Sequence, residues 1–234
     1  MKQELLYEGK AKQIYATANP EQVVMYYKDD ATAFNGIKKS VITDKGRLNA
    51  AITNELFSYL AANGIPTHLI EQLNEREQLC HTVTIFPLEV IVRNIATGSL
   101  TKRLAIKEGT RFAQPIFELC FKNDDLGDPL IIDDHAIALG LITPAQLIEV
   151  KQLTLKINQL LQQRFQDLGI DLVDFKVEFG TKADGTIVLA DEISPDSCRF
   201  WEQETARKLD KDRFRQDLGD VTQAYEEILA RLLG

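Results

Sequence analysis

The sequence predicts an α+β fold, with a small antiparallel sheet in the N-terminal part and a larger mixture of helices and strands after it. Up to about residue 98, the apolar residues form short runs separated by turn residues, which is typical of antiparallel strands. Beyond that point, an apolar stripe at helical spacing is followed by a hairpin pattern. No long linker or repeat separates the two parts, so we predict domains at residues 1–87 and 88–234 joined by a tight hinge.

Six strands and one helix are expected before residue 98. The helix covers about residues 47–62, where Leu48, Ile52, Leu56 and Leu60 recur every four residues and Gly64 follows as a stop signal. The expected strands are short apolar runs bounded by turn residues, at residues 13–17, 23–28, 37–43, 67–72, 80–86 and 88–95.

The C-terminal part is expected to begin its long helix at Thr143. Thr143, Pro144 and Gln146 have the pattern of an N-cap, a first-turn proline and a capping-box partner, and Gly169 ends the helix. A hairpin follows, with arms at residues 171–180 and 187–194 and a six-residue loop at 181–186. From residue 202 onward, we expect an amphipathic helix that packs back on the body.

Composition narrows the class of partner. The chain has 234 residues, and 35 acidic against 27 basic side chains give a formal charge of −8, so its mean field repels phosphate-rich nucleic acid and anionic membranes. Three widely spaced cysteines without a C-x-x-C motif indicate neither a disulfide framework nor a zinc site. No signal peptide or apolar run of about 20 residues is present. We therefore expect a soluble, cytoplasmic protein.

The first candidate site contains Lys10 and Lys12, which lie just before a predicted strand and follow Gly9. The glycine permits close approach of the backbone, and lysines two positions apart on an extended chain project from one face, where they would hold a polyphosphate. The plainer alternative, an exposed hairpin turn that carries lysines, stays open because the segment is not a Walker loop.

The second candidate site lies in the hairpin, whose arms carry Glu178 and Asp191. If paired residues have numbers that sum to an odd value near 367, the two carboxylates are diagonal neighbours on one face, roughly 7–8 Å apart at the backbone, where one Mg²⁺ would bridge them. A register shifted by one residue would place them on opposite faces. The alternative is a solvated sheet edge whose charges only keep the hairpin soluble.

Two arginines form the third and fourth candidates. Arg93 emerges from an apolar strand and is followed by the turn Thr97-Gly98-Ser99 at a helix start, so that a guanidinium, a hydroxyl and backbone N–H groups converge, which favours a phosphate or carboxylate. Ser99 as a plain N-cap is the alternative, but it leaves Arg93 unexplained. Arg199 lies in a turn-rich segment just after the hairpin and is expected to reach the same cleft.

Covalent catalysis by a protein nucleophile is not favoured. His68, His81 and His135 have no metal-ligand spacing, and neither a G-x-S-x-G motif nor an activated Cys–His pair is evident. Cys198, in a predicted turn, is therefore expected to have no part in the chemistry.

Together, in this order and spacing, these segments resemble the phosphoribosylaminoimidazole-succinocarboxamide synthase (SAICAR synthase) family. The resemblance covers essentially the whole chain, with two departures: Ala50 stands where a second Asn is common, and Ala105 stands where Gly is frequent, for which we expect only altered helix packing. The motifs that carry it are YEGKAKQIY, DDATAFNG, KGRLN, EVIVRNIATGSLTKRL, LGDP, VDFKVEFG and LADEISPDSCRFW.

The resemblance implies an ATP-dependent ligase of de novo purine biosynthesis. Such an enzyme joins the carboxylate of 5-amino-1-(5-phosphoribosyl)imidazole-4-carboxylate (CAIR) to the amino group of L-aspartate through an acyl phosphate, giving SAICAR, ADP and phosphate. The implied fold has a nucleotide-binding sheet domain, similar to a protein-kinase N-lobe, over a larger substrate- and metal-binding domain, with ATP between them. A homodimer or larger homo-oligomer is also implied.

The resemblance further implies a role for each candidate residue. Lys10 and Lys12 would contact the phosphates of ATP, whose adenine would lie beside the segment from Ile85 to Glu89. Mg²⁺ would be held by Glu178 and Asp191, CAIR by Arg93, Ser99 and Arg199, and the residues implied in the reaction itself are Lys10, Lys12, Asp174 and Lys176.

Two other classes of function remain as alternatives. A small-molecule kinase would form ADP with an alcohol acceptor and without L-aspartate, and it would be expected to carry an H-R-D signature, which the sequence lacks. A nucleotide-binding module without catalytic activity would tolerate loss of the metal carboxylates.

Overall fold

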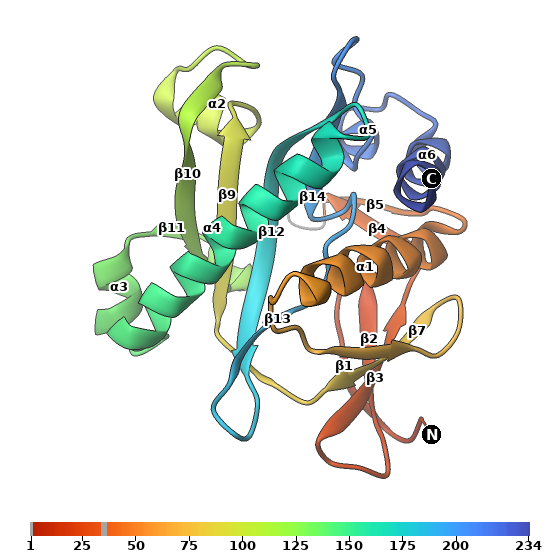
Figure 1. Cartoon of the computed structure of the whole chain (residues 1–234), viewed down its shortest axis with the longest axis vertical. Helices are drawn as coiled ribbons and strands as arrows, with labels where there is room; N and C mark the ends of the chain where they lie inside the picture. Colours follow the sequence, from red (N-terminus) through yellow and green to blue (C-terminus); the bar gives the residue numbers. More distant parts are fainter. Residues whose placement is uncertain (1, 34–36) are drawn as a thin grey trace.

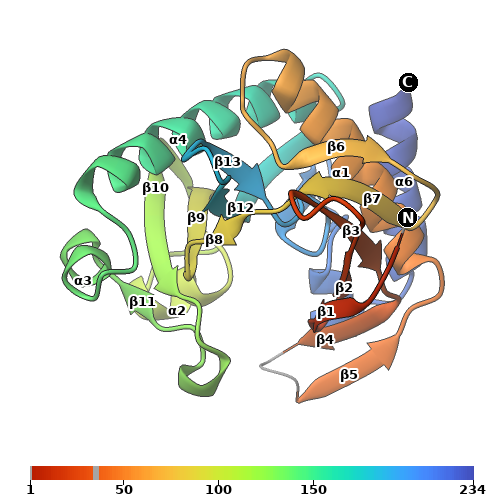
Figure 2. The same ribbon diagram turned by 90° about the horizontal axis from the view of Figure 1, so that it is seen from below.

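The computed structural model describes residues 2–33 and 37–234, which form two large antiparallel sheets and one small one (Figures 1 and 2). The first sheet is N-terminal and has the spatial order β1-β2-β3-β7-β6. Its strands are β1 (Leu5–Glu8), β2 (Lys12–Ala16), β3 (Gln22–Tyr27), β6 (Leu69–Gln72) and β7 (Glu77–His81). Beside it lies a separate two-stranded sheet of β4 (Asp30–Ala33) and β5 (Lys38–Val41).

The second large sheet is built around one long strand, β12 (Ile170–Thr181). Its first half pairs with β9 and β14, and its second half pairs with β8 and β13. Strands β10 and β11 extend the sheet beyond β9. The remaining bounds are β8 (Thr84–Ile85), β9 (Leu88–Ile95), β10 (Arg111–Phe121), β11 (Leu130–Ile131), β13 (Ile187–Ala190) and β14 (Cys198–Glu202).

Helices cover these sheets and join the two parts of the chain. Helix α4 packs against β9 and β12, and α1 packs against α6 (Figure 1). One hydrophobic cluster contains Leu48 of α1, Phe175 of β12 and Leu232 of α6, so the core continues across the predicted boundary at residue 87. The helices are α1 (Lys45–Ala62), α2 (Ser99–Leu104), η1 (Asp124–Leu126), α3 (Asp133–Ala138), α4 (Pro144–Gln166), α5 (Asp212–Arg215) and α6 (Val221–Leu233).

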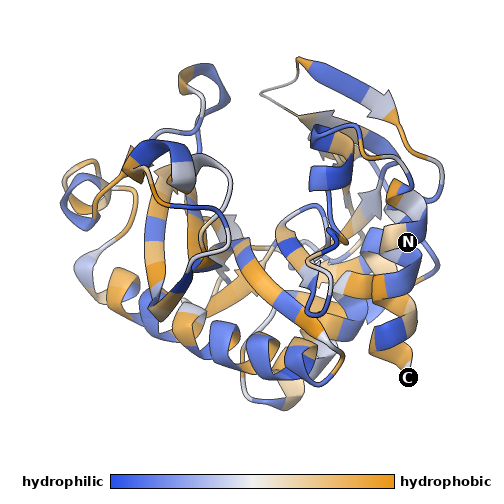
Figure 3. Cartoon of the chain, turned by 90° about the horizontal axis from the view of Figure 1, so that it is seen from above, coloured by the Kyte–Doolittle hydropathy of each residue, from blue (hydrophilic) through white to orange (hydrophobic). Residues whose placement is uncertain are grey.

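Helix α4 and its sheet follow directly from the sequence pattern. Thr143 accepts a hydrogen bond from the Gln146 N–H while the Gln146 side chain accepts from the Thr143 N–H, so the predicted capping box is confirmed. Along β9 and β12, apolar residues are interrupted by charged ones, whereas β13 is apolar throughout (Figure 3). Among the described residues, no helix is both long and apolar enough to cross a membrane.

Several predicted elements need correction. The strand expected at residues 80–86 is wrong, because β7 ends at His81 in the first sheet and β8 starts a different sheet. The tail is not helical from residue 202: β14 ends there, and the amphipathic helix α6 begins at Val221. Residues 34–36 of the DDATAFNG motif lie outside the described residues.

The predicted hairpin register is also wrong by one residue. Glu178 pairs with Ala190 and Thr181 pairs with Ile187, so paired numbers sum to an even value and the loop is one residue shorter than expected. A regular strand in this register would place Glu178 and Asp191 on opposite faces. Asp191 lies just after β13, however, with a left-handed φ of 63°, which interrupts the alternation of side chains and turns its carboxylate back toward Glu178.

Candidate active site

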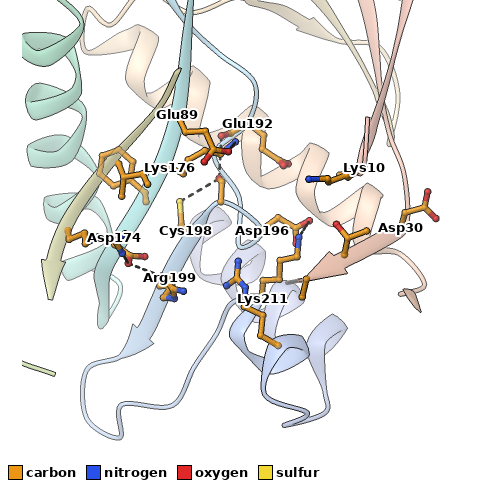
Figure 4. A pocket seen from close by; sticks show the side chains of 18 residues that line it. Lys10, Asp30, Glu89, Asp174, Lys176, Glu192, Asp196, Cys198, Arg199 and Lys211 are labelled. Atoms are coloured by element: carbon orange, nitrogen blue, oxygen red, sulfur yellow. Dashed lines mark hydrogen bonds and ion pairs between the residues drawn. The ribbon is translucent and has the colours of Figure 1, made fainter. Parts of the chain in front are cut away.

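A cavity of about 360 Å³ opens between the N-terminal strands and the second sheet (Figure 4). It is lined from β4, β9, β12, β14 and α5, together with the turn before β2. Most of its lining side chains carry a charge, so the cavity is suited to a polar, multiply charged ligand. The charged residues that line it are Lys10, Asp30, Glu89, Arg93, Asp174, Lys176, Glu192, Asp196, Arg199, Lys211 and Arg215.

One wall of the cavity carries a series of alternating ion pairs, which we call the arginine chain. At its centre is Asp174 of β12, which lies directly opposite Arg93 of β9 and Arg199 of β14 in the sheet register. Asp174 Oδ2 accepts hydrogen bonds from Arg93 Nη1 at 3.0 Å and from Arg199 Nη1 at 2.8 Å. In order, the arginine chain consists of Arg103, Glu118, Arg93, Asp174, Arg199, Asp212 and Arg215.

The two inner arginines of the arginine chain, Arg93 and Arg199, are each bound by a second carboxylate besides that of Asp174. Glu118 accepts from Nε of the β9 arginine at 2.7 Å through one oxygen and pairs with Arg103 through the other. Asp212 accepts from Nε of the β14 arginine at 2.9 Å and from Arg215 at 2.5 Å. Four guanidinium groups and three carboxylates leave an excess of one positive charge, which favours an anion at this wall.

The remaining ends of the inner arginines meet at the Gly98–Ser99 turn. Arg93 Nη2 lies 3.4 Å from Ser99 Oγ, and a Cβ added to Gly98 would lie 2.9 Å from Arg199 Nη2. The N-cap of α2 is Gly98, so the alternative in which Ser99 is a plain N-cap is wrong. The structure thus brings Arg93, Ser99 and Arg199 together, as the sequence predicts.

A second part of the site is a group of lysines and carboxylates, which we call the lysine cluster: Lys12, Lys176, Glu178 and Asp191. Lys176 Nζ lies 2.8 Å from Glu178 Oε1 and 3.1 Å from Asp191 Oδ2. Lys12 pairs closely with Asp191 Oδ1 and lies 3.5 Å from Glu192. The two predicted metal carboxylates therefore converge on one cationic group.

The charges of the lysine cluster hold one another in the ionised form. Burial alone would raise the pKa of Asp191, but Lys12 and Lys176 keep that pKa well below its usual range. Burial alone would lower the pKa of Lys176, but Glu178 and Asp191 raise it well above its usual range. The pKa of Glu89, at the edge of the cluster, is raised by burial, with Lys176 opposing the shift.

The first predicted lysine pair is separated. Residues 9–12 form a tight turn, closed by a hydrogen bond from the Gly9 N–H to the Lys12 carbonyl, rather than an extended chain. Lys10 is half exposed, pairs with Asp124 at 2.6 Å, and lies across the cavity from Arg199 (Figure 4). Lys12, in contrast, points into the lysine cluster.

The segment from Ile85 to Glu89 runs from β8 to β9, and both of these strands pair with β12 in the second sheet. Ile85 of β8 pairs with Gly180, and the Phe86 N–H donates to the Phe179 carbonyl at 2.9 Å. Glu89 of β9 lines the cavity, whereas Ile85 does not. An added Cβ at Gly180 would lie 2.8 Å from the Thr84 carbonyl oxygen, so the glycine permits this close strand approach.

A buried cluster around Asp196 was not predicted from the sequence. Asp196 accepts from Lys45 Nζ at 2.7 Å and from the Tyr225 hydroxyl at 2.7 Å, and Lys211 Nζ lies at 3.5 Å. Burial alone would raise the pKa of Asp196, but Lys211 and Lys45 hold it far below its usual range. A lysine at the start of α1 and a tyrosine of α6 thus fix the loop that precedes Arg199.

The cysteines are poor nucleophiles. Burial raises the pKa of Cys80 to about 12 and of Cys120 to about 11, and it raises the pKa of Cys198 further still. The described residues also contain no group of three or more His, Cys, Asp or Glu side chains arranged around a metal position. A metal bound by Glu178 and Asp191 would therefore need further ligands from outside the protein.

Fold and site together define an α+β protein with two large antiparallel sheets and a cleft lined by arginine and lysine side chains that form ion pairs with carboxylates. A sequence model of the SAICAR synthetase family matches residues 5–232. A phosphoribosylaminoimidazole-succinocarboxamide synthase from Clostridium botulinum (strain Eklund 17B / Type B) is 59% identical over 231 residues, which cover 99% of this chain and 98% of that protein.

Solved structures agree. The crystal structure of phosphoribosylaminoimidazole-succinocarboxamide synthase from Ehrlichia chaffeensis has a TM-score of 0.96 and 46% identity and covers 98% of each chain. A SAICAR synthetase solved in complex with ADP has a TM-score of 0.95 and 46% identity, over 98% of this chain and 97% of that one. The chain belongs to the SAICAR synthetase family, a family of ligases that form SAICAR with ATP in purine biosynthesis. The predicted family and the predicted α+β fold are confirmed.

Proposed function

We propose that the cleft joins L-aspartate to the carboxylate of CAIR through an acyl phosphate, with the arginine chain binding CAIR and the lysine cluster binding the phosphates of ATP. The observation that carries this division is that one cavity is lined both by the arginine chain and, through Lys176, by the lysine cluster, two groups of charges that are built differently. Fixed, planar guanidinium groups suit a phosphate monoester, whereas compact ammonium groups suit a mobile polyphosphate chain.

Two displacement steps account for the reaction. An oxygen of the CAIR carboxylate attacks the γ-phosphorus of ATP, and the bond to the β-phosphate oxygen breaks, releasing ADP. The ammonium group of L-aspartate gives one proton to solvent, and the resulting amine attacks the acyl carbon. The C–O bond breaks, releasing inorganic phosphate, and the nitrogen gives a second proton to solvent to form the amide. Such chemistry needs alignment and charge neutralisation rather than a protein nucleophile, which agrees with the raised pKa values of the cysteines.

In this scheme, Lys10 and Lys12 contact the ATP phosphates, and the adenine lies beside Ile85 and Glu89. Lys176 neutralises charge that develops between the γ-phosphate and the carboxylate. This role is supported by two observations: its Nζ donates to Glu178 and Asp191, and its side chain lines the same cavity as the two inner arginines. Asp174, predicted to take part in the reaction, is engaged by two guanidinium groups and so fits a supporting role better.

The donor set of the lysine cluster fits Mg²⁺. Glu178 and Asp191 supply hard carboxylate oxygens that converge on one position, and Mg²⁺ commonly takes one or two protein carboxylates and completes its shell with phosphates and water. The ion would be held by these two residues together with ATP and would neutralise phosphate charge. Lys176 and Lys12 would then exchange carboxylate partners for phosphate oxygens. Cytoplasmic location and assembly as a homo-oligomer remain predictions.

Isotope transfer tests the reaction. Protein is incubated with ATP, Mg²⁺ and CAIR labelled with ¹⁸O in its carboxylate, with and without L-aspartate, and ADP, phosphate and SAICAR are followed. We expect SAICAR only with L-aspartate, and one labelled oxygen in the released phosphate. ADP formed at the same rate without L-aspartate, with no SAICAR, would contradict ligation. Unlabelled phosphate would contradict the acyl phosphate.

A further inference from the structure

The two inner arginines of the arginine chain, Arg93 and Arg199, are each held by an acid that does not itself line the cavity. Glu118 of β10 is nearly buried and is absent from the cavity wall, and Asp212 at the start of α5 is buried at 2% exposure. Each accepts from the Nε of one inner arginine. Neither residue belongs to a motif from which the family was predicted, and each lies outside the substrate roles proposed above.

These contacts constrain the direction of both guanidinium groups. Each inner arginine is bound at Nε by an outer carboxylate and at Nη1 by the shared Asp174, so two of its three nitrogens are occupied. Because the guanidinium group is planar, two fixed nitrogens also fix the third. The third nitrogen, Nη2, points in both cases at the Gly98–Ser99 turn.

We propose that Glu118 and Asp212 are positioning residues that aim the Nη2 groups of Arg93 and Arg199 at one point, where they select the phosphate of the substrate. This inference rests on the proposed binding of CAIR by the same arginines. Without its outer carboxylate, each guanidinium group would rotate until both of its Nη atoms donate to Asp174. Nη2 would then no longer point at the Gly98–Ser99 turn. The outer carboxylates prevent that rotation by competing for Nε.

The outer carboxylates are themselves held in place. Glu118 is bound from its far side by Arg103 of α2, and Asp212 by Arg215 of α5. Burial alone would raise the pKa of Asp212, but Arg199 and Arg215 lower it, so it stays charged. Two separate helices thus act through two carboxylates on one anion position, and the selected ligand class is a phosphate monoester rather than its neutral alcohol.

The test compares CAIR with the corresponding nucleoside, which lacks the phosphate. In Glu118→Gln and Asp212→Asn we expect KM for CAIR to rise about tenfold or more, the scale of a hydrogen bond to a charged group, while KM for ATP and for L-aspartate stays unchanged. The preference for CAIR over the nucleoside, as a ratio of kcat/KM values, falls by the same factor. Glu227→Gln is the matched control, since Glu227 also pairs with two arginines, Arg207 and Arg231, but lies on α6 outside the cavity.

Two further variants keep the outcomes distinct. If Glu118→Gln does not fold, Glu118→Asp retains the charge while retracting the oxygens, and the same loss of phosphate preference is expected. Arg199→Ala tests the proposed CAIR site: an unchanged KM for CAIR there overturns the site itself. The positioning role alone is overturned if KM for CAIR rises in Arg199→Ala while Glu118→Gln and Asp212→Asn keep the full preference for CAIR over the nucleoside. Loss of preference in the acid variants but not in Glu227→Gln supports it.

Discussion

The two charged groups that border the cleft are held in opposite ways. In the arginine chain, carboxylates lie on either side of each inner guanidinium, and the members come from four paired strands and two helices. In the lysine cluster, one ammonium group is shared by two carboxylates, and a second pairs with one of them. The first group fixes donors in one direction, whereas the second neutralises charge without fixing a direction.

This difference indicates how each group responds to a ligand. A guanidinium that is bound at two nitrogens keeps its remaining nitrogen free for a ligand, so the arginine chain is preorganised. An ammonium between carboxylates must give up a partner before it binds phosphate, so the lysine cluster must rearrange when ATP and Mg²⁺ arrive. Substitutions in the lysine cluster should therefore affect turnover, and substitutions at the arginine chain should affect recognition of CAIR.

The largest effect is expected for Asp191→Asn in the lysine cluster. Removing one carboxylate charge from the proposed metal site should lower kcat by about a thousandfold or more, roughly 4 kcal/mol of transition-state stabilisation. Asparagine tolerates the left-handed conformation that Asp191 adopts, so the fold should persist. Steady-state kinetics and a thermal melt check both points. Asp184→Asn, in the exposed turn of the same hairpin, is the control, and full activity of Asp191→Asn would remove the metal role.

A smaller effect is expected from His68, which lies behind the lysine cluster. The backbone N–H of His68 donates to the Leu189 carbonyl at 2.8 Å. Burial, followed by the charge of Lys12, lowers the pKa of the imidazole to about 4. The unfolded chain takes up this proton near pH 6.5 and the folded chain does not. Stability is therefore present above about pH 6.5 and is lost as pH falls toward 4, by about 3 kcal/mol at most.

The substitution His68→Gln should reduce the fall in unfolding free energy at acid pH. Urea denaturation at pH 7 and pH 4.5 gives the change in unfolding free energy between the two pH values. We expect that change to be smaller in His68→Gln than in the unsubstituted protein, whereas His135→Gln, which removes an exposed imidazole, should not alter it. An equal pH dependence in all three proteins would show that the imidazole does not govern it.

Elements with a strong local pattern were predictable from the sequence, and those defined by distant partners were not. Strand β9 has the predicted bounds, and α4 begins at the predicted capping box. Strand β14 was missed because the turn residues before Cys198 indicate a loop, and only pairing with β12 makes the segment a strand. Strand β10 was missed for a similar reason, since its partner β9 fixes it.

The same distinction applies to the site. That Arg93, Ser99 and Arg199 lie together could be predicted because each follows a recognisable strand or turn. Glu118 and Asp212 could not be predicted, since no local pattern links an acid to an arginine in another element. Glu178 and Asp191 converge although the register that predicted it is wrong. The positive φ of Asp191 brings the two carboxylates together. The alternation of side chains along a strand does not predict the direction of a residue that lies just beyond its end.

The arginine chain is tested next by Gly98→Ala, with Gly109→Ala as its matched control. Both glycines have positive φ, 60° and 85°, so both alanine variants should lose about 1–3 kcal/mol of stability, and Gly98→Ala should lose more because its ψ of −131° lies outside the left-handed helical region. Only at position 98 would the new Cβ meet the Arg199 guanidinium, whereas nothing lies within 4 Å at position 109. We expect KM for CAIR to rise about five- to tenfold, about 1 kcal/mol or slightly more, in Gly98→Ala alone. Equal KM values in the two variants would mean that Arg199 is not rigidly placed.

The smallest effect is expected at Ala105, where the resemblance led us to expect a glycine and only a change of packing. That expectation is wrong in its reason: Ala105 is exposed and caps α2 with a left-handed φ of 52°, so its cost lies in the backbone. Ala105→Gly should raise the unfolding free energy by about 0.5–1 kcal/mol, measured by urea denaturation. Ala230→Gly, at an exposed position within α6, should lower it by about 1 kcal/mol. If the arginine chain is held by its own ion pairs rather than by the end of α2, KM for CAIR should be unchanged in Ala105→Gly. A lowered KM would mean that the backbone strain at Ala105 affects Arg103 and Glu118.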